Sequence, residues 1–303
     1  MGSGNRGGAI GFVPVTGGRV WYRVVGSGDA TPLLVIHGGP GFPSHYLDRL
    51  AVLADERPVV FYDQLGCGRS DRPEDTSLWT LDRFVRELQQ VRDALGLHEV
   101  HLLAHSWGTM LAAEYVLGEP RGVRSLVLSG PVLSARRYRD GLAVLRARLP
   151  DEVRAALDRH EAAGTTSDSD YLTAMSVFYG RHMSLLPSRP PEAQAALEQF
   201  GAACYEVMWG PSEFLMTGNL RDFDVTQRLG ALRLPALLTA GRADLTRPEE
   251  AEYYRSLIPN ARLEIFERSA HLAMLEEPEA FNSVVRRFLR DVDQRSPDCR
   301  RRG

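Results

Sequence analysis

The chain has 303 residues with 36 basic and 39 acidic side chains, a formal charge of −3 and 44% hydrophobic residues, a composition that excludes disordered and fibrous classes. The near-neutral balance also lacks the concentrated positive charge of nucleic-acid binders, so we expect no nucleic-acid partner. Every basic residue is arginine, which excludes mechanisms that use a lysine nucleophile or Schiff base.

Short apolar runs, rich in β-branched and aliphatic residues and bounded by Gly, Pro or Asp, recur along the chain. Because these runs are apolar on both faces, they predict buried strands of a parallel sheet. Helical patterns lie between several of them, at Leu81–Leu95 and Trp107–Leu117. The alternation predicts an α/β fold, with a mostly parallel sheet flanked by helices. The predicted strands are Val20–Val25, Leu33–Ile36, Val59–Tyr62, Val100–Ala104, Ser125–Leu128, Ala236–Ala240 and Leu263–Phe266.

The alternation of strands and helices breaks between about Pro131 and Gly230. The patterns at Arg136–Arg159 and Glu192–Phe200 are helical, and strand patterns resume at Leu234. A helical block of this size between strands is typical of a cap inserted above the sheet. We therefore expect a core at 10–131, a helical cap at 132–221, a second part of the core at 222–293, and a disordered basic tail at 294–303.

The strongest local motif is the string Leu102-Leu103-Ala104-His105-Ser106-Trp107-Gly108. An apolar strand that runs into a serine and then directly into a helix is typical of a nucleophile elbow, which lifts the hydroxyl to the end of the sheet. Ala104 stands where the usual pattern has glycine, a small-residue substitution that close packing can accept. The helix that begins at Trp107 points its free N–H groups at the reacting centre. Taken alone, the string would fit a buried structural serine better.

A second motif, Leu34-Val35-Ile36-His37-Gly38-Gly39-Pro40-Gly41, is a strand that ends in a glycine-rich loop. Such a loop can bring backbone N–H donors close to a substrate oxygen because no side chain obstructs it. Lipases and esterases form half of the oxyanion hole from a related loop, and the other half from the residue after the nucleophile. We therefore predict an oxyanion hole made by the N–H groups of Gly39 and Trp107. Without Ser106 downstream, a simple turn would be the better interpretation.

A serine hydroxyl needs a base to remove its proton, and the base needs an acid to orient it. Asp244 follows the predicted strand at Pro235–Ala240, and His271 lies in a loop after the next strand. The chain order Ser106, Asp244, His271 is the order that the α/β-hydrolase fold requires. We therefore predict an α/β-hydrolase whose catalytic residues are these three. Epoxide hydrolases and dehalogenases are excluded because they need an aspartate at the position of the serine.

Two further polar groups have structural interpretations. His105 could line the pocket beside the nucleophile, but a packed or solvated imidazole is the simpler interpretation. Asp63 is predicted to hold a turn after its strand together with Arg69.

The cysteines and the chain start bear on compartment and cofactors. Cys67, Cys204 and Cys299 form no metal-binding spacing, and an odd number fits no closed disulfide framework. Residues 1–11 lack the regions of a signal peptide, and no run approaches the roughly 18 apolar residues of a membrane span. The string at 66–68 lacks the remaining spacing of a dinucleotide fingerprint. We predict a cytoplasmic protein without membrane contact, metal or cofactor.

Three strings together identify a family resemblance over roughly residues 10 to 293. They are His37-Gly38-Gly39-Pro40-Gly41, Asp63-Gln64-Leu65-Gly66-Cys67-Gly68-Arg69-Ser70, and Met208-Trp209-Gly210-Pro211-Ser212-Glu213-Phe214 with Thr217-Gly218. The chain resembles the proline iminopeptidase family of α/β-hydrolases, most closely the branch that contains the tricorn-interacting aminopeptidase and related amino-acid amidases. The last string lies in the predicted cap and is the most diagnostic.

The resemblance implies a serine peptidase that removes an N-terminal residue, often proline, without a metal. By motif match, Glu213 would hold the free α-ammonium of the substrate and Tyr205 would belong to the same pocket. A carboxylate in a partly desolvated pocket favours a cationic amine over an acylated one. In this branch a second acid commonly follows the triad aspartate, and here that position is Leu245. Glu213 alone could serve small amides or esters, or could instead pair with an arginine.

The predicted function is hydrolysis of small peptides or amino-acid amides at their N-terminal residue through an acyl-enzyme. The alternative within enzymes is an esterase, lactonase or acyl-transferring relative that acts on a neutral small molecule, for which Leu245 would be suited. A catalytically silent fold used as a binding module is a different class, against which the intact triad argues. The sequence leaves the exact substrate and the oligomeric state open.

Overall fold

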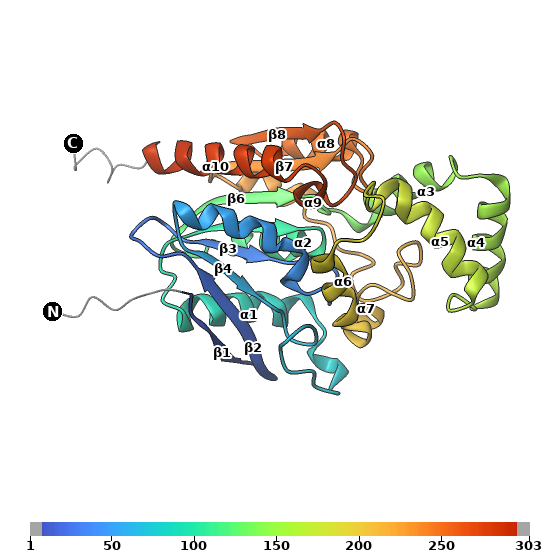
Figure 1. The fold of residues 1–303 in the computed structure, drawn as a ribbon, viewed down its shortest axis with the longest axis horizontal. Coiled ribbons are helices and arrows are strands. Elements are labelled where there is room, and N and C mark those ends of the chain that lie inside the picture. Colours follow the sequence, from blue (N-terminus) through green and yellow to red (C-terminus); the bar gives the residue numbers. More distant parts are fainter. Residues whose placement is uncertain (1–7, 296–303) are drawn as a thin grey trace.

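The computed structural model describes residues 8–295, which form one eight-stranded sheet covered by helices (Figure 1). The strands are β1 (Ile10–Val15), β2 (Gly18–Val25), β3 (Leu33–Ile36), β4 (Val59–Tyr62), β5 (Val100–His105), β6 (Val123–Ser129), β7 (Ala236–Gly241) and β8 (Ala261–Phe266). Their order in the sheet is β1-β2-β4-β3-β5-β6-β7-β8. Pairing is parallel from β4 to β8 and antiparallel where β2 meets β1 and β4. The predicted mostly parallel sheet is confirmed.

Successive side chains of each strand point to opposite faces of the sheet, so each face has its own core. Leu34 and Ile36 of β3 pack on one face with α1 (Leu81–Ala94), α2 (Trp107–Leu117) and α8 (Pro248–Leu257). Leu33 and Val35 pack on the other face with η1 (Ser44–Asp55) and α10 (Pro278–Arg295). A sheet buried on both sides needs strands that are apolar on both sides, which is the pattern the sequence carries. Three short helical segments lie between the longer elements: η2 (Thr76–Leu78), η3 (Thr226–Ala231) and α9 (Ala273–Glu276).

The parallel register brings the carboxyl ends of six strands to one edge. Ile36 of β3 lies opposite Ala104 of β5, and His105 lies opposite Ser129 of β6. The segments that follow β3, β4, β5, β6, β7 and β8 therefore leave the sheet at this edge. In open α/β sheets this carboxyl edge is where ligands bind.

Five helices lie between β6 and β7: α3 (Ala135–Arg146), α4 (Asp151–Ala163), α5 (Ser169–His182), α6 (Pro191–Glu198) and α7 (Ala202–Met208). Figure 1 shows α3, α4 and α5 projecting beyond the carboxyl edge of the sheet. The helical pattern predicted at 136–159 is divided between α3 and α4, which are separated at Pro150. Proline has no N–H and collides with the preceding turn, so it stands before α4 rather than inside a helix. That residues 132–221 act as a cap stays our proposal.

Two ends of the chain also differ from expectation or lie outside the described part. Strand β1 was not predicted, because Gly11 and Pro14 interrupt its apolar residues, and most of the strand is exposed or half-exposed. Helix α10 continues to Arg295, so the first two residues of the predicted tail at 294–303 are helical; the remainder lies outside the described residues. Within residues 8–295, no helix combines the length and the apolar character needed to cross a membrane.

A buried ion pair on α1 anchors the loop that follows β4. Arg83 and Glu87 pair with side chains only 2% and 0% exposed. The Glu87 carboxylate also accepts the N–H of Leu65 at 3.3 Å, and Arg83 Nε donates to the Leu78 carbonyl at 2.9 Å. Burial raises the pKa of Glu87, and the charge and hydrogen bond of Arg83 oppose that rise. Removing one partner would leave the charge of the other buried and unpaired.

We expect Glu87→Ala to destabilise the protein by about 3–5 kcal/mol, because Arg83 would remain buried and unpaired. The measurement is the free energy of unfolding in denaturant. Glu267→Ala is the matched control, since Glu267 pairs with Arg242 where both side chains are more than half exposed, and its cost should stay below about 1 kcal/mol. Equal costs for the two variants would contradict this account of the buried pair.

Candidate active site

Ser106 occupies a strained turn between β5 and α2. Its backbone has φ 54° and ψ −125°, a conformation that side-chain-bearing residues rarely adopt. The Ser106 N–H donates to the carbonyl of Ser129 on β6 at 2.9 Å. Gly108 permits the tight approach of α2 to β3, since a Cβ there would lie 2.7 Å from the carbonyl oxygens of Ile36 and His37. The predicted elbow geometry is therefore present, with the serine side chain at the carboxyl edge.

Asp244 and His271 form a buried pair in the loops after β7 and β8. His271 Nδ1 donates to Asp244 Oδ1 over 2.6 Å, with both side chains at most 2% exposed. The carboxylate also accepts the N–H groups of Thr246 at 2.8 Å and Gly241 at 3.2 Å. Because a carboxylate can only accept, the proton lies on Nδ1, and Nε2 of His271 is left as a base.

Burial alone would lower the pKa of His271, but the net effect is a rise. The charge of Asp244 and its hydrogen bond stabilise the imidazolium, and the charge of Glu213 adds to them. An opposite charge in contact favours the protonated form and here outweighs desolvation. The imidazole of His271 therefore holds a proton more readily than a buried histidine without a carboxylate would.

The imidazole of His271 lies beside the strand end that carries Ser106. A Cβ on Gly130, directly after β6, would lie 2.6 Å from His271 Cε1 and 2.8 Å from Nδ1. The ring centroids of His271 and His105 are 4.5 Å apart. Because β6 pairs with β5, the structure brings Ser106, Asp244 and His271, the three residues predicted from chain order, to one edge of the sheet.

Helix α5 contacts both of the loops that carry Asp244 and His271. His182, its last residue, accepts the N–H of His271 on its backbone carbonyl at 3.1 Å. Its ring Nδ1 donates to the carbonyl of Ala243 at 2.9 Å. One residue of α5 therefore contacts the loop of the base and the loop of the acid at the same time.

The glycine-rich loop after β3 is fixed by a side-chain network that the sequence did not reveal. His37 Nε2 accepts the N–H of Gln64 at 2.8 Å, and its Nδ1 donates to the Gly38 carbonyl at 2.9 Å. Gln64 donates back to the His37 carbonyl at 3.0 Å and accepts from Trp107 Nε1 at 2.9 Å. Burial lowers the pKa of His37 to about 4, so the ring is neutral and supplies one donor and one acceptor.

This network joins the loop of Gly39 to the start of α2 at Trp107, the two predicted oxyanion donors. Gly39 follows Gly38 directly and has φ 115°. Trp107 is the first residue of α2, so its N–H has no acceptor within the helix. Gln64 bridges the loop of the first donor and the side chain of the second.

Glu213 is a buried carboxylate that contacts two tyrosines. It is 8% exposed, and its two oxygens accept from the Tyr138 hydroxyl at 2.7 Å and from the Tyr205 hydroxyl at 3.4 Å. Burial raises the pKa of Glu213, while the Tyr138 bond, the nearby His271 and the Tyr205 bond act against that rise. Among residues 8–295 its hydrogen-bonding partners are these tyrosines, so the alternative of an arginine pair is wrong. Leu245 is buried at 2% exposure.

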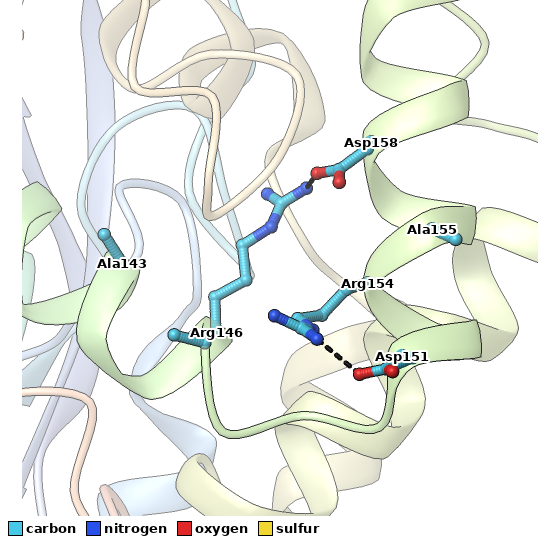
Figure 2. A pocket seen from close by; sticks show the side chains of 7 residues that line it. Ala143, Arg146, Asp151, Arg154, Ala155 and Asp158 are labelled. Carbon is cyan, nitrogen blue, oxygen red and sulfur yellow. Dashed lines mark hydrogen bonds and ion pairs between the residues drawn. The ribbon is translucent and has the colours of Figure 1, made fainter.

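The segment that carries Glu213 is braced from α3, α4 and α5. Arg146 of α3 lies over the ring of Phe214 with 4.8 Å between its Cζ and the ring centroid, and pairs with Asp158 and Glu161 of α4. Figure 2 shows Arg146 reaching Asp158 across a surface hollow of about 490 Å³ between α3 and α4. On the other side, the Tyr171 hydroxyl donates to Ser212 Oγ at 2.6 Å. The hollow is lined by none of the predicted site residues.

The remaining predicted residues have structural roles. Asp63 accepts from Arg69 Nε at 2.7 Å and from Ser44 Oγ at 2.6 Å, so the predicted turn is confirmed. Cys67 and Cys204 are buried free thiols, and Cys299 lies outside the described residues. No group of three or more His, Cys, Asp or Glu side chains in the described part of the chain could hold a metal.

Comparison with known proteins places the chain among hydrolases. Residues 31–278 match the family model described as alpha/beta hydrolase fold. The chain is 46% identical over 285 residues to proline iminopeptidase of Heyndrickxia coagulans, covering 93% of this chain and 99% of that protein. The crystal structure of proline iminopeptidase from Mycobacterium smegmatis matches with a TM-score of 0.88 at 39% identity, over 94% of this chain and 99% of that one. The crystal structure of VinJ matches with a TM-score of 0.91 at 35% identity and the same coverage.

We expect Gly130→Ala to lower the reactivity of Ser106 toward a fluorophosphonate probe by about 100-fold, because the new methyl group would displace the His271 ring. Gly164→Ala is the matched control: both glycines have positive φ, but a Cβ on Gly164 meets nothing within 4 Å. Both variants should lose about 1–2 kcal/mol of stability from backbone strain, measured by unfolding. Full reactivity of Gly130→Ala would overturn the placement of the ring.

Proposed function

The chain belongs to the proline iminopeptidase family of α/β-hydrolases, and we propose that Ser106, His271 and Asp244 are the triad with which this serine hydrolase removes an N-terminal residue. Similarity to proline iminopeptidases favours release of N-terminal proline as the function of this chain, over the esterase, lactonase and acyl-transfer alternatives. The observation that carries the triad assignment is the buried 2.6 Å hydrogen bond between His271 and Asp244 beside the strained serine turn.

The proposed reaction begins when Ser106 Oγ attacks the carbonyl carbon of the first residue and its proton passes to His271 Nε2. The N–H groups of Gly39 and Trp107 would stabilise the negative oxygen of the tetrahedral intermediate. His271 then gives its proton to the leaving nitrogen as the amide bond breaks, which leaves an ester on Ser106. Water attacks this ester with His271 as base, and the free amino acid departs.

Recognition of the free amine is assigned to Glu213, with Tyr205 and Tyr138 holding its two oxygens. Its carboxyl has a raised pKa because it is buried, and an incoming ammonium would stabilise the ionised form through a charge-assisted hydrogen bond. An acetylated amine carries no charge and would gain nothing from that carboxylate. Leu245, directly after Asp244, is buried and carries no charge, so we propose Glu213 as the single acidic contact for the amine.

We propose short peptides or amino-acid amides as substrates and the cytoplasm as the place of action. In such substrates the first residue, on the N-terminal side of the scissile bond, carries the free amine that Glu213 would bind. Two of the three thiols, Cys67 and Cys204, are free and buried, in keeping with a reducing compartment.

The amine assignment predicts that prolyl p-nitroanilide is hydrolysed at least about 100-fold faster than its N-acetylated form. Glu213→Gln should lower kcat/KM for the free amine by about 10- to 100-fold, the value of a hydrogen bond to a charged group. Glu206→Gln on the exposed side of α7 is the matched control and should leave kcat/KM unchanged. Indifference to acetylation, or turnover of simple esters alone, would favour the neutral-substrate alternative.

The triad assignment predicts that a neutral fluorophosphonate labels the wild-type protein and does not label Ser106→Ala. Protonated His271 cannot accept the serine proton, so the labelling rate should rise with pH. Because the pKa of His271 is raised, the midpoint should lie above about 6.5, the ordinary imidazole value. The measurement is the labelling rate across pH 5 to 9. A folded wild-type protein that fails to label would support the binding-module alternative.

A further inference from the structure

A chain of buried hydrogen bonds runs beneath the serine turn from the oxyanion loop to the loop of the base. The N–H of Gly38 donates to the Tyr46 hydroxyl oxygen at 2.8 Å. That hydroxyl lies 2.8 Å from Nδ1 of His105, and Nε2 of His105 lies 3.0 Å from the backbone carbonyl of His271. The two linking side chains come from η1 and from the last position of β5.

The two ends of this chain decide where every proton lies. The carbonyl of His271 can only accept, so Nε2 of His105 carries the proton, and Nδ1 of a neutral ring must accept. Tyr46 therefore donates its proton to Nδ1, while its oxygen accepts from Gly38, which can only donate. One arrangement satisfies all the groups, and it requires a neutral His105.

Burial of Tyr46 and His105 maintains this arrangement of protons. Tyr46 is 0% exposed and His105 is 2% exposed, so water does not compete for these bonds. Burial, together with the charge of His271, lowers the pKa of His105 well below its usual range. Burial also raises the pKa of the Tyr46 phenol, which keeps its proton available for donation.

We infer that Tyr46 and His105 are positioning residues that fix the oxyanion donor of Gly39 relative to the base His271. Neither side chain is needed as a nucleophile, base or amine ligand. Each end of the chain is instead a backbone group of a loop that must keep its place: Gly38 directly precedes the donor Gly39, and the carbonyl belongs to His271 itself. On the proposed mechanism, the transition state depends on both loops at once, whereas binding of the substrate amine depends on Glu213.

Tyr46→Phe would leave the N–H of Gly38 and Nδ1 of His105 buried without partners. We expect kcat to fall by about 10- to 100-fold with KM unchanged, because the oxyanion donor would be misplaced only where charge develops. The labelling rate with a neutral fluorophosphonate should fall by a similar factor, since the phosphoryl oxygen also uses the oxyanion hole. This second readout needs no amine recognition, so it holds even if the proposed peptide substrate is incorrect.

The matched control is Tyr62→Phe on β4. Tyr62 is as buried as Tyr46, but its hydroxyl has no hydrogen-bonding partner within the described residues. Tyr62→Phe removes one buried hydroxyl, as Tyr46→Phe does, but breaks no hydrogen bond with these residues. It should therefore leave kcat and the labelling rate unchanged. If Tyr62→Phe lowers both rates as much as Tyr46→Phe, general loss of packing explains the effect and the inference is overturned.

A pair of substitutions at His105 tests the polarity of the chain. Glutamine supplies one donor and one acceptor, as the neutral imidazole does, whereas leucine supplies neither. We expect His105→Gln to retain at least about tenfold more labelling activity than His105→Leu. Equal losses, with both variants folded by circular dichroism, would assign His105 to packing alone.

Discussion

The strained backbone at Ser106 is the constraint on which the other parts of the site depend. A positive φ at this residue turns the chain from β5 directly into α2, so the serine side chain and the next N–H leave the sheet at the same point. The turn is possible because Gly108 lets α2 approach the end of β3. The register of β3, β5 and β6 then decides which loops surround the serine. The turn at Ser106 therefore determines both the path of the chain from β5 into α2 and the position of the serine side chain.

Three buried histidines around this turn show how one residue type can take different roles. Burial lowers the pKa of each imidazole, and for His37 and His105 no adjacent carboxylate reverses that effect, so both stay neutral. His271 alone has a carboxylate against its ring, and its pKa is raised. The neutral rings act as fixed donor–acceptor pairs between loops, and the third ring can exchange a proton.

Elements with a strong local pattern could be predicted from the sequence, and long-range hydrogen bonds could not. Strands β3 and β4 and helix α2 match their predicted ranges because short apolar runs with clear stops specify them. The chain order of Ser106, Asp244 and His271 was enough to predict that these three residues lie at one edge of the sheet. Tyr138 and Tyr46 meet their partners 75 and 59 positions away. In the sequence these tyrosines are ordinary apolar positions of amphipathic segments, so their roles could be seen only in the structure.

The contacts of His182 restrict how this protein can be altered by recombination. Since the last residue of α5 holds the loops of both the acid and the base, the helices inserted between β6 and β7 are not an independent module. A segment grafted from a relative would have to supply a carbonyl and a ring donor at this same point. Exchange of whole helices between relatives would therefore disturb the loops of Asp244 and His271 unless both contacts were kept.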